Sequence, residues 1–223
     1  MSSSVTSCAR CGTCCSKGGP GLHVQDVELY ASGSLTKDDL LTLRKGERVR
    51  DNVRGGVIDL DHEVVRVRSN AGSSACCFYD PVEKGCAIYA QRPLECRVLK
   101  CWEPAGLMSM YDRDRVGRLE LIPGGSALGE LILEHEQHCG ILEVRELVTG
   151  ATSGLEKALK GLADMLRFDA SLRRGLQDRT GASDQVLEFL FGRPLPRILP
   201  VYGLRATQQD GKLTITPVHG RYG

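Results

Sequence analysis

Apolar residues recur at helical spacing mainly in the C-terminal half of the chain. The clearest run, which predicts an amphipathic helix beginning near Ala127, consists of Leu128, Leu131, Ile132, His135 and Cys139, at i, i+3, i+4, i+7 and i+11. A second helix is expected to open at a capping box formed by Ser153 and Glu156. A third is expected from Ser183 to Phe191, ending at Gly192.

The N-terminal half has shorter and less regular patterns. Thr36 can cap a helix whose apolar side would be Leu40, Leu41 and Leu43. Two short apolar runs, 57–60 and 63–68, predict a hairpin that turns at Asp61 and His62. A further hairpin is expected near the C-terminus from residues 198–202 and 213–218.

These elements predict an α+β fold in which an irregular cysteine-rich half with short hairpins packs against a mainly helical half. We expect a cysteine-cluster metal-binding domain over residues 1–150. Residues 151–223 would then be a helical extension with a C-terminal hairpin, packed on the same core.

Charge excludes strong attraction to nucleic acid or to an anionic membrane. The chain has 29 basic and 28 acidic residues, a formal net charge of +1. No stretch approaches the apolar length of a membrane-spanning helix, and residues 1–7 lack the apolar run of a signal peptide. We therefore expect a cytoplasmic protein with reduced thiols, whose partner would be a redox or assembly protein rather than nucleic acid or membrane.

The ten cysteines are clustered, with four in residues 8–15, five in residues 76–101 and one at position 139. Structural disulfides would be spread along the chain, and free core cysteines would be scattered singly. Because thiolates are soft ligands, clustered cysteines in a reduced protein favour zinc or an iron–sulfur centre. The cysteines therefore predict a metal site.

The spacing of the first cysteines favours iron over zinc. Cys8-x-x-Cys11-x-x-Cys14 matches the ligand loop of [4Fe–4S] ferredoxins, although Cys15 is followed by Ser16 and not by proline. A zinc ribbon would need a second Cys-x-x-Cys pair downstream, and this chain has none. We therefore expect a [4Fe–4S] cluster, with zinc as the alternative.

Two adjacent cysteine pairs, Cys139 and His135 each have more than one interpretation. In the adjacent pairs Cys14–Cys15 and Cys76–Cys77, neighbouring side chains usually diverge, so one of each pair would serve a second metal or a second iron, or would simply pack. Cys139 is either a distant ligand or a small buried hydrophobic residue. His135, on the same helix face, is either a core histidine with a hydrogen-bond partner or a residue of the metal site.

Two motifs give the chain a family resemblance. Cys8-x-x-Cys11-x-x-Cys14-Cys15, followed by Cys77-Phe-Tyr and Cys86-x-Ile-Tyr-x-x-Arg-Pro-x-x-Cys96-Arg, resembles the CxxCxxCC (YkgJ-like) family of zinc- or iron-chelating proteins. The resemblance implies cysteine-ligated metal, and it implies as ligands Cys8, Cys11, Cys14, Cys15, Cys77, Cys86, Cys96 and Cys139. Cys76 and Cys101 match its pattern less well.

The same resemblance assigns Tyr89, Arg92 and Arg97 to the cofactor site. The two arginines could offset the negative charge of the thiolates and donate hydrogen bonds to sulfur. Alternatively they form ordinary surface ion pairs, for instance with Glu95.

Three functions compete. The first is a metal-binding protein with an iron–sulfur cluster, used for electron transfer, sensing or metallo-assembly. The second is an interaction module folded around zinc. The third, less favoured, is an enzyme similar to flagellin lysine N-methylases, which carry a related domain; residues 124–129 lack the glycine spacing of a cofactor loop, and no catalytic residue can be singled out.

Overall fold

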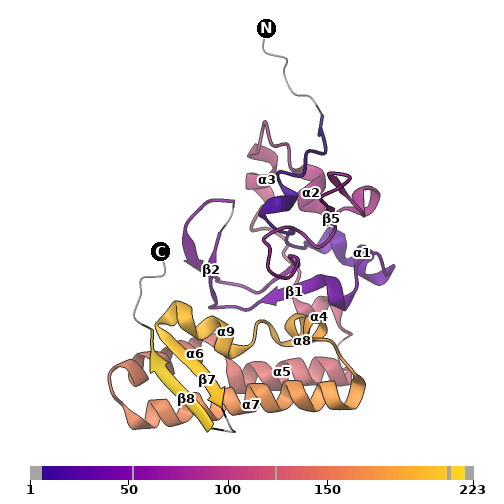
Figure 1. The fold of residues 1–223 in the computed structure, drawn as a ribbon. Helices are drawn as coiled ribbons and strands as arrows, with labels where there is room; N and C mark the ends of the chain where they lie inside the picture. Colours follow the sequence, from indigo (N-terminus) through magenta and orange to yellow (C-terminus); the bar gives the residue numbers. More distant parts are fainter. Residues whose placement is uncertain (1–6, 52, 124, 210–211, 219–223) are drawn as a thin grey trace.

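A layer of helices in the C-terminal half supports a loop-rich N-terminal half that carries nine of the ten cysteines (Figure 1). The computed structural model describes residues 7–51, 53–123, 125–209 and 212–218. Residues 1–6 and 124, and the expected turn residues 210–211, lie outside the described residues. The expected α+β fold is confirmed, whereas the division of the chain at residue 150 stays a prediction.

The N-terminal half consists of short strands and short helices. Its strands are β1 (Leu40–Leu43), β2 (Arg48–Arg50), β3 (Val57–Asp59), β4 (Val64–Val67), β5 (Tyr79–Asp80) and β6 (Gly85–Cys86). Its α-helices are α1 (Val27–Ala31), α2 (Leu94–Val98), α3 (Ala105–Met110) and α4 (Arg118–Leu121). Its 3-10 turns are η1 (Cys15–Lys17), η2 (Val24–Asp26), η3 (Lys37–Asp39) and η4 (Tyr89–Gln91).

The predicted helix after Thr36 is wrong beyond its first turn. Asp39 Oδ2 accepts a 2.8 Å hydrogen bond from the Thr36 N–H and closes η3, but Leu40 then begins β1. This strand pairs antiparallel with β4, which places Leu40 opposite Val67. The side chains of Leu40 and Val67 are fully buried, so contacts with distant residues outweigh the local helix signal.

The hairpin predicted from residues 57–68 is also wrong in its pairing. Both strands form, but β3 pairs with β2 and β4 pairs with β1. Val65 and Val67 of β4 are fully buried, whereas the three residues of β3 are exposed. The two strands therefore belong to different surfaces of the molecule, and the turn between them does not close a hairpin.

In the C-terminal half all three predicted helices form, the second of them beginning at Glu156. The helix α5 spans Ala127–Cys139, and α8 spans Asp184–Phe191 with the Ser183 hydroxyl accepting a 3.1 Å bond from the Val186 N–H. The remaining elements are α6 (Ile141–Thr152), α7 (Glu156–Thr180), α9 (Leu195–Ile198), η5 (Leu199–Tyr202), β7 (Leu204–Gln209) and β8 (Lys212–Pro217).

Three details of the predicted C-terminal half are wrong. Ser153 does not cap α7, because its hydroxyl donates to the Thr149 carbonyl at 3.0 Å and ends the unpredicted helix α6. The segment 198–202, expected as a strand, is helical: proline lies in the first turns of α9 and η5, where it fits a helix start. The first strand of the expected hairpin therefore forms only from Leu204, as β7, and pairs with β8, which lies within one residue of the expected range 213–218.

The buried apolar residues form two clusters. The first lies between the N-terminal half and α8 and includes Leu22, Leu35, Leu40, Val65, Val67, Cys76, Phe189 and Phe191. The second lies among the C-terminal helices and includes Cys139, Ile141, Val144, Leu162, Leu166, Leu195 and Leu204. Among the described residues, no helix is both long and apolar enough to cross a membrane.

Arg118, in α4, joins the two halves through a buried ionic network. Its guanidinium donates to Glu63, to Glu136 of α5 at 2.8 Å and to the Leu190 carbonyl of α8 at 2.6 Å. The side chain is 1% exposed, so these bonds are shielded from water. A charge buried in this way is stable only while its partners remain in place.

We predict that Arg118→Met lowers the free energy of unfolding by about 3 kcal/mol, because two carboxylates lose their shared partner in a buried site. Chemical denaturation measures this change. The control is Arg174→Met on the exposed face of α7, which should alter stability by less than about 0.5 kcal/mol. Equal effects of the two substitutions would show that the network does not hold the halves together.

Candidate metal centre

Backbone hydrogen bonds bring the two cysteine segments together. The Cys76 N–H donates to the Cys15 carbonyl at 2.8 Å, and the Ser74 hydroxyl donates to the Ser16 carbonyl at 2.7 Å. The partners are 61 and 58 residues apart in the sequence. The loop that carries the first cysteines therefore lies directly against the loop that precedes Cys77.

Gly12 seats the first loop on an aromatic ring. Its φ is +76°, and a Cβ built at this position would lie 2.4 Å from the Tyr79 ring, so only glycine fits. Tyr79 is in turn paired with Cys86 across β5 and β6. The loop 8–15 is thereby held next to the hairpin that carries Cys86.

A buried carboxylate fixes the helix that carries Cys96. Glu95, in α2, accepts hydrogen bonds from the Gly21 N–H at 2.8 Å and from Arg115 Nη1 at 2.7 Å, and its Oε1 lies 3.4 Å from His23 Nε2. Burial opposes its negative charge, but His23 and Arg115 outweigh that effect and lower the pKa of Glu95. These bonds join α2 to the chain just after the first cysteine loop, and His23 gains a partner that the sequence did not indicate.

Five thiols share one half-buried space; we call them the thiol cluster, and its members are Cys14, Cys15, Cys76, Cys86 and Cys96. Cys14 Sγ lies 3.9 Å from Cys15 Sγ. Burial and then the neighbouring Cys14, Cys76 and Cys86 thiolates raise the pKa of Cys15 to about 12. Burial followed by the other four thiolates raises the pKa of Cys96 as well.

Cys76 is the member of the thiol cluster that sequence reasoning missed. The family motif pointed to Cys77, but it is the negative charge of Cys76 that raises the pKa of Cys86 and of Cys96. A hydrogen bond from Cys77 and the positive charge of Arg66 lower the pKa of Cys76 to about 7. Cys77 lies at the edge of the cluster, where its N–H donates to the Arg68 carbonyl and where Cys76, burial and Asp39 raise its pKa.

The remaining cysteines of the N-terminal half are exposed. Cys8 and Cys11 lie on the first loop, where Cys8 Sγ accepts a 3.4 Å bond from the Arg10 N–H and Cys11 Sγ lies 3.2 Å from the Thr13 hydroxyl. That hydroxyl lowers the pKa of Cys11. Cys101 is exposed after α2.

Tyr89 and Arg92 lie beside the thiol cluster. The guanidinium groups of Arg10 and Arg92 stand 3.9 Å and 4.0 Å from the centre of the Tyr89 ring, and Arg92 Nη1 donates to the Tyr89 carbonyl at 2.7 Å. Burial raises the pKa of the Cys86 thiol, and the positive charge of Arg92 offsets part of that rise. One cationic side chain from each cysteine motif therefore stacks on the Tyr89 ring, and that of Arg92 also acts on Cys86.

Arg97 has a different partner from the one proposed from the sequence. Its Nη2 lies 3.5 Å from Asp26 Oδ1, and not against Glu95, which is occupied by Gly21 and Arg115. Asp26 also accepts a 2.8 Å bond from the Leu94 N–H at the start of α2. Arg97 thus helps to fix α2.

The structure does not bring Cys139 or His135 to the thiol cluster. Cys139 is fully buried in the second hydrophobic cluster, with its Sγ 3.8 Å from the Met165 carbonyl, and burial raises its pKa to about 12. His135 Nε2 donates to Asp169 at 2.8 Å. Both lie on α5, in the helical layer below β1 and α8 (Figure 1).

The comparison with family models matches residues 7–115 to CxxCxxCC, described as a putative zinc- or iron-chelating domain. Residues 7–115 belong to the CxxCxxCC family. The comparisons with curated proteins and with solved structures found no match. The matched range ends before α5, so it contains the whole thiol cluster and excludes Cys139.

The donor set of this CxxCxxCC domain fits a metal that prefers sulfur. Two thiolates on one tetrahedral zinc at 2.3 Å lie about 3.8 Å apart, close to the Cys14–Cys15 separation of 3.9 Å. Among the described residues, no three histidine, cysteine, aspartate or glutamate side chains are yet arranged to hold an ion. Ligation by three or more thiols would therefore require side-chain rotations within the cluster.

The titration of His135 gives a prediction about the pH dependence of stability that does not involve the metal site. Burial lowers its pKa in the folded protein, while the unfolded chain titrates near 6.5. As the pH falls, the unfolded chain therefore takes up a proton before the folded protein does. The free energy of unfolding should then decrease below about pH 6.5, by up to about 1.4 kcal/mol per pH unit.

We predict that His135→Gln flattens this slope, whereas His138→Gln, an exposed position on the same helix, leaves it unchanged. Denaturant unfolding between pH 7 and pH 5 measures both variants, a range set around the unfolded value. An unchanged slope in His135→Gln would mean that this buried imidazole does not control the acid side of the stability profile.

Proposed function

We propose that the thiol cluster of the CxxCxxCC domain binds a cysteine-ligated iron–sulfur cluster of the [4Fe–4S] type. The observation that carries the proposal is the gathering of five thiols from two distant segments in one half-buried space. There, burial and mutual repulsion raise the pKa of Cys15 and Cys96. A bound cationic centre would reverse that repulsion, so thiol deprotonation and metal binding are coupled.

Two further features favour iron–sulfur ligation. The neighbouring loop adds Cys8 and Cys11 at ferredoxin-like spacing, so the domain offers more thiols than the four that a single zinc ion takes. Arg10 and Arg92 stand beside the same space. Their positive charges would offset the net negative charge of a thiolate-ligated cluster and tune its potential.

Zinc is the second candidate, favoured by one distance. In a [4Fe–4S] cluster held by four cysteines each iron takes one thiolate, whereas Cys14 Sγ and Cys15 Sγ, 3.9 Å apart, are spaced for a shared ion. In that case the metal would fix the two loops to each other, and the domain would act as an interaction module.

The position of the site supports an accessory role in electron transfer, sensing or metallo-assembly. Cys8, Cys11 and Cys14 are exposed, whereas Cys76 and Cys96 lie deeper. A centre held here would be near the surface and within reach of a protein redox or assembly partner. We propose such a partner.

Anaerobic purification with iron, sulfide and zinc analysis tests the metal. We predict brown protein that contains iron and inorganic sulfide. Colourless protein with stoichiometric zinc would replace the iron–sulfur proposal by the zinc one, and protein that takes up neither metal on reconstitution would contradict both.

Substitutions test the assignment of the thiol cluster. We predict that Cys86→Ser and Cys96→Ser each lose metal and lower folded stability, since metal bound only by the native state contributes folding free energy. The control is Cys139→Ala, which should keep its metal although it removes a buried side chain. Full metal content in Cys96→Ser, or loss of metal in Cys139→Ala, would overturn the assignment.

A further inference from the structure

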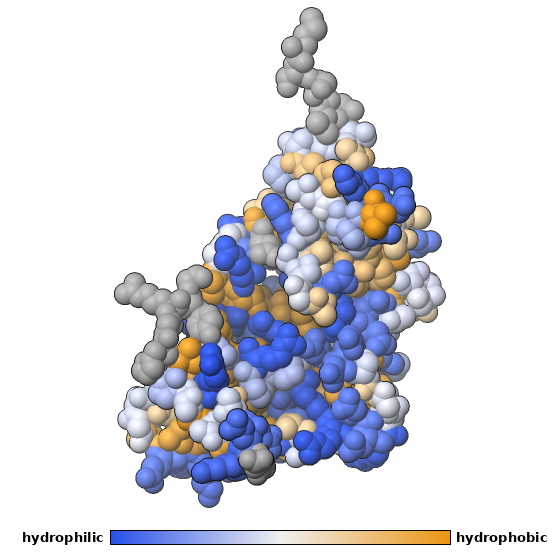
Figure 2. Space-filling model, viewed as in Figure 1, coloured by the Kyte–Doolittle hydropathy of each residue, from blue (hydrophilic) through white to orange (hydrophobic). Residues whose placement is uncertain are grey.

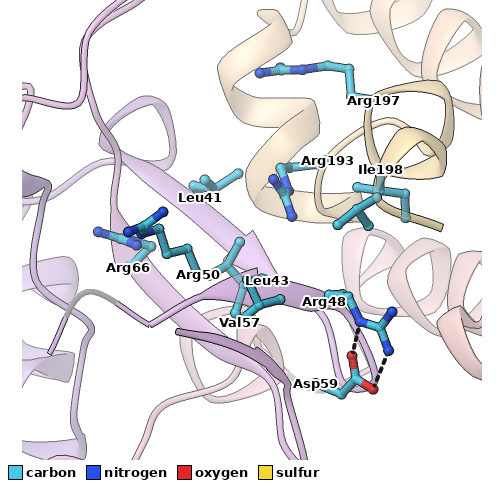
Figure 3. A pocket seen from close by; sticks show the side chains of 12 residues that line it. Leu41, Leu43, Arg48, Arg50, Val57, Asp59, Arg66, Arg193, Arg197 and Ile198 are labelled. Atoms are coloured by element: carbon cyan, nitrogen blue, oxygen red, sulfur yellow. Dashed lines mark hydrogen bonds and ion pairs between the residues drawn. The ribbon is translucent and has the colours of Figure 1, made fainter. Parts of the chain in front are cut away.

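A second candidate site is a cavity that contains none of the cysteines in its lining. This cavity of about 700 Å³ opens between the strands β1 to β3 and the segment of α9 and η5 (Figure 3). Its volume is in the range of pockets that bind small molecules. Figure 2 shows an apolar recess at this place, bordered by hydrophilic side chains.

The floor of the cavity is aliphatic. It is formed by Leu41, Leu43, Val49, Val57, Ile198 and Val201. Val57, which is 53% exposed, is open to solvent in this lining. Such a surface suits the hydrocarbon part of a ligand.

The walls of the cavity are basic. Five arginines and one aspartate line it: Arg48, Arg50, Arg66, Arg193, Arg197 and Asp59. Three of the arginines have carboxylate partners, because Arg48 pairs with Asp59, Arg193 with Glu47, and Arg197 with Glu188. The other two arginines of the lining have no carboxylate within ion-pair distance among the described residues.

Those two are Arg50 and Arg66. Among the described residues, Arg50 has no side-chain hydrogen bond or ion pair, and its side chain is exposed. Arg66 donates to the Gly19 carbonyl at 2.6 Å and has no carboxylate within ion-pair distance in the described part of the chain. Figure 3 shows both among the side chains that line the cavity.

We propose that this cavity binds an amphiphilic anion, with its carboxylate or phosphate group on Arg50 and Arg66 and its aliphatic part on the floor. Guanidinium groups bind both anions through paired, charge-assisted hydrogen bonds. The aliphatic floor adds affinity for a chain attached to that head group. The site uses none of the thiols, although it shares Arg66 with the surroundings of Cys76.

The register of β2 and β3 provides a sharp variant. Val57 lies directly opposite Arg50 in the antiparallel pair. Val57→Glu therefore places a carboxylate beside Arg50, where it competes with a bound anion for the guanidinium. A cross-strand pair of opposite charge does not weaken the sheet. Val57→Gln has the same size without the charge and is the matched control.

Titration calorimetry with octanoate and with octyl phosphate as probes tests the proposal. We expect saturable binding of at least one probe at one site, and a loss of affinity of about tenfold or more in Arg50→Gln and in Val57→Glu. Val57→Gln and Arg174→Gln, the latter on the exposed face of α7, should stay within about threefold of the unmodified protein. The stronger probe identifies the head group.

Two reference ligands complete the experiment. Octanol has the chain without the charge, and inorganic phosphate has the charge without the chain; both should bind more weakly than the probes. Absence of saturable heat with both probes, equal affinity of Val57→Glu and Val57→Gln, or equal binding of octanol would overturn the proposal. Metal content measured in Val57→Glu is the control: if it is unchanged, any loss of anion binding is not caused by damage to the metal centre.

Discussion

Five thiols placed side by side in a half-buried space repel one another as soon as they ionise, and the cysteine-rich half is built around that constraint. Burial and the neighbouring thiolates raise the pKa of Cys15 and Cys96, so the cluster is costly to ionise without a cation nearby. Arg66 reduces the cost at Cys76 and Arg92 at Cys86. A sulfur-preferring metal would remove most of what remains, which is the physical reason for assigning this domain to zinc or iron.

The scaffold that gathers the thiols consists of a few close contacts and not of regular structure. Gly12 on Tyr79, the Cys76 to Cys15 backbone bond and the buried carboxylate of Glu95 each join segments far apart in the sequence. The helical layer beneath supplies a rigid base, to which Arg118 connects the loops. Arg66 of β4 also lines the basic cavity, so one cationic side chain lies between two sites of different chemistry.

The sequence predicts well what depends on neighbours along the chain. The limits of α5 and α8 follow from apolar spacing and, for α8, from the Ser183 cap. It fails where distant contacts decide: the leucines after Thr36 form a strand because Val65 and Val67 lie beside them. The motif gave most of the cluster but chose Cys77 over Cys76, because which of two adjacent thiols turns inward depends on the backbone around them. The partner of Arg97 and the distance of Cys139 from the cluster depend on packing and left no signal in the spacing.

X-ray absorption at the metal edge of the anaerobically purified protein tests the central claim, that these thiolates hold a metal, most directly. It reports the element and the atoms bound to it, independently of any substitution. The account predicts iron whose nearest neighbours are sulfur, with a second iron close by, as in a cysteine-ligated cluster. A metal surrounded mainly by oxygen or nitrogen would contradict it, because the thiol cluster would then not be the site of binding.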